Sequence, residues 1–441
     1  MISVTDSRAR TAGPATSRST ASRSTASRDT ASRSTASRDT DSRSTSHRSR
    51  RPARPAATRA TALALAVTAV LATGPAAEAA TPQHQAGRHQ ATQQALRDVV
   101  EKGGLPGVVA EARDGRGRWS GAAGYADTST HRERTRADHF RAASITKVFL
   151  ATVLLQLAEE GALDLDDSVE KWLPGLVRGN GNDGRAIRLR QLLNHTSGLA
   201  NYSEDAEFAR RSSGPAFPGH RYDTYRPTDL VALAMKQPPH SAPGEAARYS
   251  NTNYVLVGMI IEKATGRSYA HETERRILAP LRLRETSFPG LSPRMPLPHP
   301  TAYSRLRQKE PDAPVVDATE QNMSWLGAAG DMISTTGDLN TFFRALTKGQ
   351  LLGPAATRAM FTTVPAEVAG YRYGLGIESV TLSCGVTVVG KTGRANGSVS
   401  GVVGTRDGSH QLTFNINGDW MGDAATYVGV VEAEFCGTRK R

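Results

Sequence analysis

The stretch from Ser144 to Gly161, SITKVFLATVLLQLAEEG, is apolar on nearly every side of a helical projection. A helix on a protein surface carries a polar face, so this pattern predicts a helix that is buried all round. Gly161 is a typical residue to end it. A chain of 441 residues can enclose such a helix, and we therefore expect a large globular domain built around it.

Strand patterns lie toward both ends of the chain, and helical patterns lie between them. Gly107 to Tyr125 predicts a hairpin around a turn at residues 114–117. Four further strand-like runs follow residue 370, and a final helix is predicted at about 423–435: the runs are YRYGLGIESV, GVTVVG, SVSGVVGT and QLTFNI. Roughly 160–350 is mostly helices and loops. This order predicts an α+β domain whose sheet is built from both termini, with a helical insertion.

The basic character of the chain is concentrated at its front. Residues 1–59 hold 13 Arg and 4 Asp and so contribute +9 to the formal net charge of +13. From Arg18 to Arg48 the arginines recur every five residues in polar repeats with almost nothing apolar between them. We therefore predict that residues 1–59 are a disordered Arg/Ser/Thr-rich leader. An arm for an anionic partner is the alternative, but no aromatic residues are interleaved, so nucleic-acid binding is not expected.

Residues 60–79 predict export. The run ATALALAVTAVLATG, residues 60–74, follows several arginines and is apolar for about 15 residues, which is short for a membrane span. Ala77 and Ala79 are small residues at the positions that a signal peptidase reads. We therefore predict cleavage before Ala80, a secreted or cell-wall-associated domain over 80–441, and no stable membrane span after cleavage. A buried helix is the alternative interpretation of residues 60–74.

The chain contains two cysteines, Cys384 and Cys436. In an oxidising compartment an isolated pair within one domain favours a disulfide over two free thiols. The 11 histidines form no HExxH motif and no cluster with acidic residues, and CxxC is absent. Neither a metal site nor a cofactor is therefore predicted.

Ser144 and Lys147 place a nucleophile and a base at the start of the apolar helix. Residues at i and i+3 share a helix face, so the lysine amine can reach the serine hydroxyl, and the helix N-terminus favours negative charge on that oxygen. The pattern alone is weak, because Ser168 and Lys171 repeat it in a charged stretch. A lone SxxK is more often a serine helix cap than a catalytic pair.

Two more elements follow in order along the chain. Tyr249-Ser250-Asn251 is the only Tyr-x-Asn, and Lys391-Thr392-Gly393, directly after an apolar strand-like run, is the only Lys-Thr-Gly. Taken separately, Tyr249 could be a surface tyrosine, Asn251 a helix cap and Lys391 a charged residue on an edge strand. SxxK, YxN and KTG together are the signature of serine penicillin-recognising enzymes.

Residues 92–437 resemble the secreted serine D-alanyl-D-alanine carboxypeptidases and class C β-lactamases. Besides the three motifs, the segments LLNHTSGL (192–199) and NMSWLGAAGDMISTTGDL (322–339) carry the resemblance. It implies a β-lactamase/transpeptidase-like α+β fold, with an antiparallel sheet flanked by helices and an all-helical subdomain. It also implies a disulfide between Cys384 and Cys436, and peptides of the peptidoglycan type or β-lactams as substrates, with cell-wall peptidoglycan as the partner.

The resemblance assigns catalytic roles to four residues. Ser144 would attack the substrate carbonyl and form an acyl-enzyme. Lys147 would accept or relay the serine proton, and Tyr249 would pass a proton to the leaving amine and later activate water. Lys391 would hold Tyr249 in its useful state and attract an anionic substrate.

Five further residues would bind the substrate. Asn251 would hydrogen-bond its amide, and Thr392 would bind its carboxylate. Gly393 would let the substrate approach the strand, and the backbone N–H of Arg394, with that of Ser144, would form the oxyanion hole. Trp325 would either line the cleft or belong to the core.

Two departures from the similar carboxypeptidases bear on the substrate. They carry His-Thr-Gly where this chain has Lys391-Thr392-Gly393. The arginine that holds the terminal carboxylate falls here at about Glu378, which would repel that group unless Arg394 turns into the cleft to replace the arginine. We expect a D-Ala-D-Ala carboxypeptidase, with an esterase, a D-amino-acid amidase or a class C-like β-lactamase as alternatives. A receptor that binds cell-wall peptides without turnover is a further alternative.

Overall fold

The computed structural model describes residues 89–420 and 425–437. The predicted leader, 1–59, and the predicted signal segment, 60–79, lie outside these residues. Within the described part of the chain, no helix is both long enough and apolar enough to cross a membrane.

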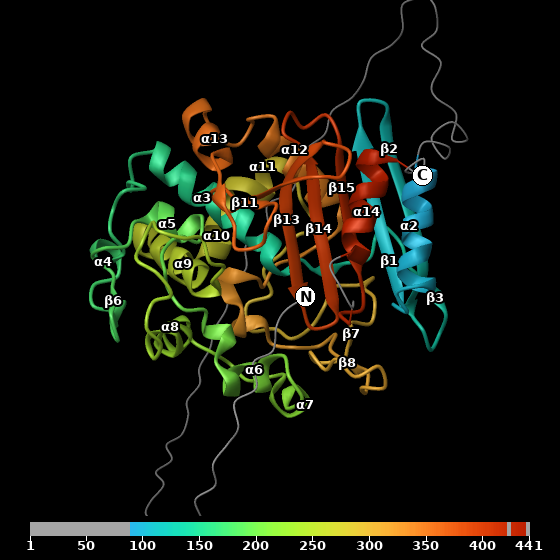
Figure 1. Ribbon diagram of the computed structural model, residues 1–441, viewed down its shortest axis with the longest axis horizontal. Coiled ribbons are helices and arrows are strands. Elements are labelled where there is room, and N and C mark those ends of the chain that lie inside the picture. The colour runs from blue at the N-terminus through green and yellow to red at the C-terminus, as the bar shows by residue number, and fades with distance from the viewer. Residues whose placement is uncertain (1–88, 421–424, 438–441) are drawn as a thin grey trace, which may run out of the picture. The chain divides into compact units, whose positions relative to one another are not determined.

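A nine-stranded antiparallel sheet joins the two ends of the domain (Figure 1). The N-terminal hairpin, β1 and β2, adds to the C-terminal strands because β1 pairs with β15, with Val108 opposite Ile416. This arrangement confirms the predicted α+β sheet built from both termini. In spatial order the strands are β10 (Val364–Pro365), β11 (Tyr371–Tyr373), β12 (Glu378–Thr381), β13 (Thr387–Ala395), β14 (Ser398–Thr405), β15 (Gln411–Ile416), β1 (Gly107–Asp114), β2 (Gly117–Asp127) and β3 (Arg132–Glu133).

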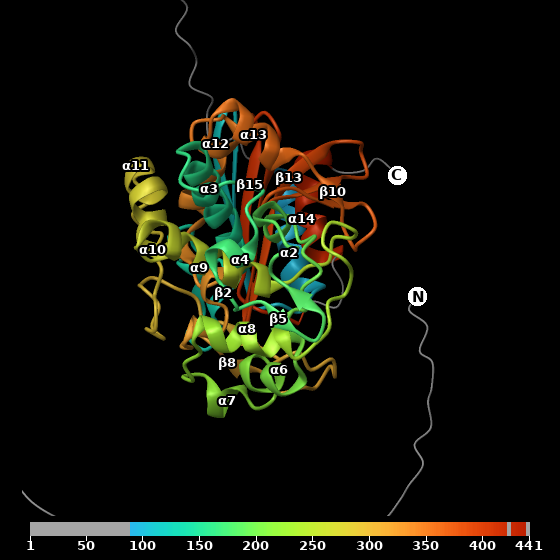
Figure 2. The ribbon, with the colours of Figure 1, turned by 90° about the vertical axis from the view of Figure 1, so that its left-hand side faces the viewer.

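Helices cover both faces of the sheet, as Figure 2 shows with the sheet between them. On one face lie α2 (Gln90–Glu101) and α14 (Ala425–Cys436), whose apolar residues share a core cluster with Phe414 and Ile416. On the other face lies α12 (Thr336–Thr347). Every residue of β15 is buried, as expected of a central strand covered on both sides.

The predicted central helix is present as α3 (Thr146–Glu159). Eleven of its 14 residues are buried, and Phe149 stacks on Phe342 of α12 with ring centroids 3.6 Å apart. The helix ends two residues before Gly161, which has a φ of +72°. Burial on all sides explains why its sequence carries no polar face.

The middle of the chain is mainly helical, as predicted, although two short two-stranded ladders interrupt it. In one, β5 (Arg178–Gly179) pairs with β6 (Asn182–Asp183), and in the other β7 (Tyr303–Ser304) pairs with β8 (Val316–Asp317). Ser168 accepts a hydrogen bond from the Lys171 backbone N–H at 3.2 Å, so the second SxxK is a helix cap. The helices of this region are α4 (Val169–Trp172), α5 (Leu189–Leu193), α6 (Ala206–Ser212), α7 (Phe217–His220), α8 (Pro227–Met235), α9 (Asn251–Thr265), α10 (Tyr269–Thr273) and α11 (Ala279–Leu281), with α13 (Pro354–Phe361) after α12.

The disulfide at Cys436 and the contacts of Glu434 hold α14 in place. The predicted disulfide is present and joins Cys384, in the turn between β12 and β13, to Cys436 at the end of α14, with a Cα–Cα distance of 5.7 Å. Glu434, whose side chain is 1% exposed, accepts a hydrogen bond from Thr92 of α2 at 2.6 Å and contacts His410 at 2.6 Å. The C-terminal helix is therefore tied to both the sheet and α2.

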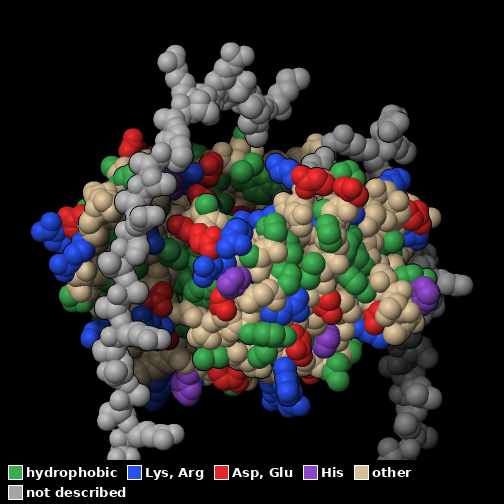
Figure 3. Space-filling view, turned by 90° about the horizontal axis from the view of Figure 1, so that it is seen from below, with side chains coloured by type: hydrophobic (Ala, Val, Ile, Leu, Met, Phe, Trp, Pro, Cys, Tyr) green, Lys and Arg blue, Asp and Glu red, His purple; other side chains and the backbone are tan. Residues whose placement is uncertain are grey.

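Charged side chains of both signs are interspersed over the face drawn in Figure 3. No continuous patch of one sign is visible on the described residues of that face. The basic excess of the sequence lies chiefly in residues 1–59.

Candidate active site

Ser144 lies at the entrance to α3. The short strand β4 (Phe140–Arg141) pairs with β9 (Ile333–Ser334), and a 3-10 turn, η1 (Ala143–Ile145), leads from it into the helix. Ala143 has a φ of +48°, a left-handed conformation that costs a residue with a Cβ on the order of 1–3 kcal/mol. A backbone hydrogen bond next to it keeps this conformation in place, since Ala142 N donates to Met332 O at 2.8 Å. The nucleophile is thus presented on a fixed, strained turn.

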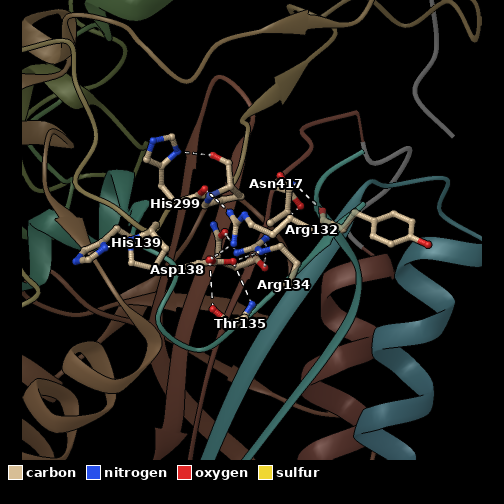
Figure 4. A network of polar contacts seen from close by, with 12 residues as sticks. Arg132, Arg134, Thr135, Asp138, His139, His299 and Asn417 are labelled. Carbon is tan, nitrogen blue, oxygen red and sulfur yellow. Dashed lines mark hydrogen bonds and ion pairs between the residues drawn. The ribbon is translucent and has the colours of Figure 1, made fainter. Parts of the chain in front are cut away.

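A buried ion pair anchors the segment that leads to Ser144 (Figure 4). Arg134 and Asp138 have side chains 0% exposed and bond at 2.9 Å. Arg134 also donates to Asn415 Oδ1 at 2.9 Å and to Asn417 Oδ1 at 3.0 Å, so it reaches the end of β15. Asp138 additionally accepts a hydrogen bond from Arg132 at 2.9 Å. Removing Asp138 would leave the buried charge of Arg134 uncompensated, so this carboxylate fixes the segment against the sheet.

Lys147 is fully buried and contacts three oxygen atoms. Its Nζ lies 3.0 Å from Ser144 Oγ, 2.9 Å from Asn251 Oδ1 and 2.5 Å from the carbonyl oxygen of Ala329. Burial, assisted by the positive charge of Lys391, holds the pKa of Lys147 well below its usual value. A neutral amine donates to Asn251 and Ala329 and directs its lone pair at Ser144. This geometry suits a general base.

Tyr249 contacts the nucleophile from the other side. Its hydroxyl lies 2.7 Å from Ser144 Oγ. Desolvation raises the pKa of Tyr249 above its usual range, so the phenol is neutral and can donate to the serine oxygen. The amines of Lys147 and Lys391 lie 5.0 and 5.2 Å from the centre of its ring. The amines of two lysines thus flank the ring of a tyrosine whose hydroxyl can deliver a proton.

Asn251 is the first residue of α9 and is buried beside Lys147. Its Oδ1 accepts from Lys147, and its Nδ2 donates to Ser203 Oγ at 3.1 Å. This pair of bonds fixes the amide orientation. The predicted Ser144, Lys147, Tyr249 and Asn251 therefore form one connected cluster.

Lys391 of β13 forms a close ion pair with Glu378 of β12, and their side chains are only 5% and 13% exposed. Glu378 is opposite Gly390 in the strand register, which places the two side chains together. The carboxylate compensates the lysine charge and also raises the pKa of the nearby Tyr249. The acidic residue noted in the sequence is therefore part of the site.

Gly393 lets β13 lie against the nucleophile segment. A Cβ at this position would lie 2.1 Å from Ala142 O, which no side chain can occupy without a shift. The β12–β13 ladder ends at Gly390, so β12 does not pair with residues 391–395 of β13. Thr392 lies on this stretch and is partly exposed. An extended substrate backbone can pair with such a free edge.

The side chains of two predicted binding residues, Arg394 and Trp325, make their contacts away from Ser144. The Arg394 guanidinium donates to the carbonyl oxygen of Asp419 at 2.5 Å, near the β13–β14 turn, where Asp419 also accepts from Gly397 N. Trp325 is 5% exposed and packs in the main core cluster, where its carbonyl oxygen accepts from Tyr202. The structure thus favours the core interpretation of Trp325.

His195 was not predicted from the sequence, although it lies inside the segment LLNHTSGL. It is 2% exposed, and its ring centroid is 4.5 Å from that of Tyr249 and 5.3 Å from that of Tyr373. Desolvation and the nearby lysines hold the pKa of His195 well below its usual value, so the ring is neutral. Its Nδ1 lies 3.3 Å from Ser250 N, next to Tyr249. His195 therefore packs against Tyr249 and helps to hold it in position.

Several known proteins are similar to this chain. The sequence profile of the Beta-lactamase family matches residues 92–429. The crystal structure of a D-stereospecific amidohydrolase from Streptomyces sp. superposes with a TM-score of 0.74 at 53% identity, covering 79% of this chain and 99% of that chain. The D-amino acid amidase from Ochrobactrum anthropi SV3, complexed with D-phenylalanine, superposes with a TM-score of 0.68 at 27% identity, covering 79% of this chain and 98% of that one.

A curated penicillin-binding protein is also similar to this chain. Penicillin-binding protein 4* of Bacillus subtilis (strain 168) is 31% identical over 287 residues, which are 62% of this chain and 60% of the relative. The chain therefore spans about 60% of the length of that relative. The profile match extends over most of the domain and includes all three motifs, and it shows that this chain belongs to the β-lactamase family of serine penicillin-recognising proteins.

Proposed function

We propose that the protein is a serine amidohydrolase that acts on amides of D-amino acids through an acyl-serine intermediate. The observation that carries the proposal is the Lys391–Glu378 ion pair. A carboxylate already neutralises this lysine, so the site offers little positive potential to a substrate that ends in a free carboxylate. A neutral amide is not repelled. The similarity to a D-stereospecific amidohydrolase, at 53% identity, supports the same substrate class.

Acylation follows from the contacts around Ser144. The serine proton moves to the lone pair of Lys147 as Oγ forms a bond to the substrate carbonyl carbon. Tyr249 donates its proton to the leaving nitrogen as the C–N bond breaks. At the end of this step Lys147 holds the serine proton and Tyr249 is a phenolate, and both groups lie beside Ser144 Oγ, at 3.0 and 2.7 Å. The amine leaves, and the acyl group stays on Ser144.

Deacylation uses the same groups in reverse. A water molecule gives one proton to the Tyr249 phenolate as its oxygen attacks the acyl carbon. Lys147 returns its proton to Ser144 Oγ as the bond between the acyl carbon and Oγ breaks, which releases the acid and restores Ser144. The backbone N–H groups of Ser144 and Arg394 would stabilise the oxyanion in both steps, a contribution of about 3 kcal/mol to the barrier in such sites. The close approach that Gly393 allows between β13 and Ala142 supports this assignment.

A D-Ala-D-Ala carboxypeptidase, the activity expected first from the sequence, is the second candidate. The 31% identity to a penicillin-binding protein and the intact Lys391-Thr392-Gly393 favour it. Glu378 disfavours it, because this carboxylate would lie beside the terminal carboxylate of the peptide. Esterase or β-lactamase activity would use the same nucleophile and differ in the acyl group and in the rate of deacylation.

Hydrolysis of four substrates by wild type, Ser144→Ala and Ser168→Ala tests the proposal. The substrates are D-phenylalanine amide, L-phenylalanine amide, a peptide ending in D-Ala-D-Ala and a penicillin. We expect wild type and Ser168→Ala to hydrolyse the D-amide fastest and Ser144→Ala to be inactive. Ser168 is the matched control, because it occupies the same SxxK pattern as a helix cap. A D-Ala-D-Ala peptide turned over faster than the D-amide would refute the amidase proposal in favour of the carboxypeptidase.

We further propose that the protein is exported and acts outside the cell or at the cell wall. The Cys384–Cys436 disulfide and the apolar run before Ala80 support this. Intact-mass measurement of protein recovered from the culture medium of an expressing bacterium checks the cleavage site. A product that begins at Ala80 is expected, and retention of the whole protein inside the cell contradicts the proposal.

A further inference from the structure

His195 contacts the backbone on both sides of Tyr249. Its carbonyl oxygen accepts a hydrogen bond from Arg248 N at 2.9 Å, and its ring nitrogen Nδ1 accepts one from Ser250 N at 3.3 Å. The ring itself lies against Tyr249, with centroids 4.5 Å apart. His195 has a φ of +62°, a left-handed conformation that is costly for a residue with a Cβ. The segment 248–250 is therefore held at three points by one histidine in a strained conformation.

The bond from Ser250 decides which nitrogen of the His195 ring carries the hydrogen. A backbone N–H can only donate, so Nδ1 is the acceptor and carries no hydrogen. Since a neutral imidazole has one N–H, that hydrogen is on Nε2. A hydrogen on Nδ1 would point at a second donor, and Ser250 N would lose its acceptor. The hold on Tyr249 thus depends on one tautomer of His195.

A chain of buried hydrogen bonds leads from a second backbone N–H to the same ring nitrogen. Leu199 N donates to Ser197 Oγ at 3.1 Å, and the Ser197 hydroxyl donates to Asn253 Oδ1 at 2.6 Å. With its oxygen occupied, the Asn253 amide directs Nδ2 at His195 Nδ1, at 3.2 Å. Ser197, Asn253 and His195 are each no more than 2% exposed. The backbone at the two ends of the chain therefore sets the direction of every bond in it.

The groups around the ring disfavour a second proton on His195. They are the rings of Tyr249, of Tyr254 in α9 and of Tyr373 in β11, and the amines of Lys147 in α3 and Lys391 in β13. Burial raises the pKa of all three tyrosines, so their hydroxyls are neutral. The carboxylate of Glu378 is already paired with Lys391. A proton on Nδ1 would meet the lysines as like charges and would displace two hydrogen-bond donors.

We infer that Asn253 is a positioning residue that fixes His195 as its neutral Nε2–H tautomer. Ser197 orients the amide of Asn253 for this role. The fixed histidine in turn holds Tyr249 so that its hydroxyl lies 2.7 Å from Ser144 Oγ. The assignment of the tautomer does not depend on the reaction. Its consequence for catalysis rests on the proposed acyl-serine mechanism, in which Tyr249 delivers a proton.

The tautomer is measured by long-range 1H–15N NMR of full-length protein labelled with [ring-15N]histidine, because protonated and unprotonated ring nitrogens differ in chemical shift. The His195 signal is the one absent from His195→Gln. From about pH 6 to 9 we expect wild type to carry one hydrogen, on Nε2, without titration of the ring. A hydrogen on Nδ1, or uptake of a second proton in this range, would overturn the inference.

Asn253→Asp keeps the shape of the side chain but replaces the donor with an acceptor. The carboxylate would attract a proton to Nδ1, so we expect the hydrogen of His195 to appear there and Ser250 N to lose its acceptor. For D-phenylalanine amide, kcat/KM should fall about 10- to 100-fold, the loss found when a hydrogen-bond partner of a metal-bound histidine is removed. KM should stay within about threefold, because Tyr249 acts in the chemical step.

Asn340→Asp is the matched control. Asn340 is also 0% exposed and lies in α12, where its Nδ2 donates to Glu111 O at 2.9 Å, so the same change removes a buried hydrogen bond elsewhere. Both variants should melt at a lower temperature, but Asn340→Asp should keep the wild-type His195 signal and kcat/KM within about threefold. Equal kcat/KM in the two variants would overturn the positioning role. A wild-type His195 signal in folded Asn253→Asp would show that Asn253 does not fix the tautomer.

Should Asn253→Asp fail to fold, Ser197→Ala replaces it. This change removes the donor that orients the Asn253 amide, so we expect the hydrogen of His195 to be shared between the two ring nitrogens, and an unchanged signal would overturn the inference. A wild type that hydrolyses no amide would refute the proposed function instead, and the spectrum of its His195 ring would still decide the tautomer.

Discussion

Replacing Gly393 with alanine tests whether β13 must lie as close to the nucleophile segment as the structure places it. The new Cβ would be 2.1 Å from Ala142 O and 2.9 Å from Ser400 Oγ, whereas real Cβ atoms essentially never approach within 3.0 Å. The serine hydroxyl can rotate away, but the carbonyl oxygen of Ala142 belongs to the backbone. The two segments must therefore separate by about 0.9 Å.

This separation would act directly on the reacting atoms. Ser144 follows Ala142 by two residues, and the two proposed oxyanion donors belong to the two segments that would move apart. A misplacement of about 1 Å can reduce an enzymatic rate about 100-fold, which equals about 2.7 kcal/mol of barrier. We expect Gly393→Ala to lower kcat/KM by about this factor, with most of the loss in kcat because the oxyanion develops only in the transition state.

Hydrolysis of D-phenylalanine p-nitroanilide, an amide with a coloured product, provides the assay, and thermal melting confirms that the variant is folded. Gly429→Ala is the matched control, because a Cβ there meets no atom within 4 Å and alanine is favoured by about 1 kcal/mol over glycine in a helix. It should have wild-type activity. A folded Gly393→Ala protein whose kcat/KM stays within about threefold of wild type would show that the close approach is not required.

Three further predictions follow from the contacts described. Lys147→Met should lower kcat/KM at least about 100-fold. The kcat/KM of wild type should fall as the pH drops through the lowered pKa of Lys147, because protonation removes the lone pair of the amine. A flat pH profile would contradict the role of Lys147 as a base. The pKa of Glu434 is lowered from 4.5 to about 2, since hydrogen bonds from two histidines and a threonine outweigh the effect of burial. The ionised carboxylate should therefore contribute up to about 3 kcal/mol of stability above pH 4.5, which is lost as the pH falls toward 2. Glu434→Gln should accordingly lower the free energy of unfolding at pH 7 in urea titrations, and an unchanged value would contradict this reasoning. Reduction of the Cys384–Cys436 disulfide opens a loop of about 50 residues and should lower the free energy of unfolding by about 4 kcal/mol in the same titrations. Two free thiols in unreduced, denatured protein would disprove the pairing.

Much of the fold could be predicted because its signals are local. The apolar stretch after Ser144 identified the central helix, since complete burial leaves no polar face. The candidate site could be predicted because SxxK, YxN and KTG each fix residue types at short spacing, and the structure brings Ser144, Lys147, Tyr249 and Lys391 together.

The rest of the site depends on the register and packing of distant segments. The Lys391–Glu378 pair exists because β12 and β13 align Glu378 with Gly390, a register that no motif encodes. His195 reaches Tyr249 only through the packing of the helical region, 54 positions away in the sequence. Ala329 acts through its carbonyl oxygen, and a backbone group leaves no trace in the choice of side chain.

The pairing of β1 with β15 also sets when this protein can become active during synthesis. Val108 and Ile416 are 308 positions apart, so the sheet closes only after the last strand has been made. Contacts of such long range are slow to form, because a long loop must close before any pairing is gained. Ser144, the proposed nucleophile, is synthesised 247 residues before Lys391. A nascent chain that has not yet reached β13 therefore carries Ser144 without the rest of the proposed catalytic cluster.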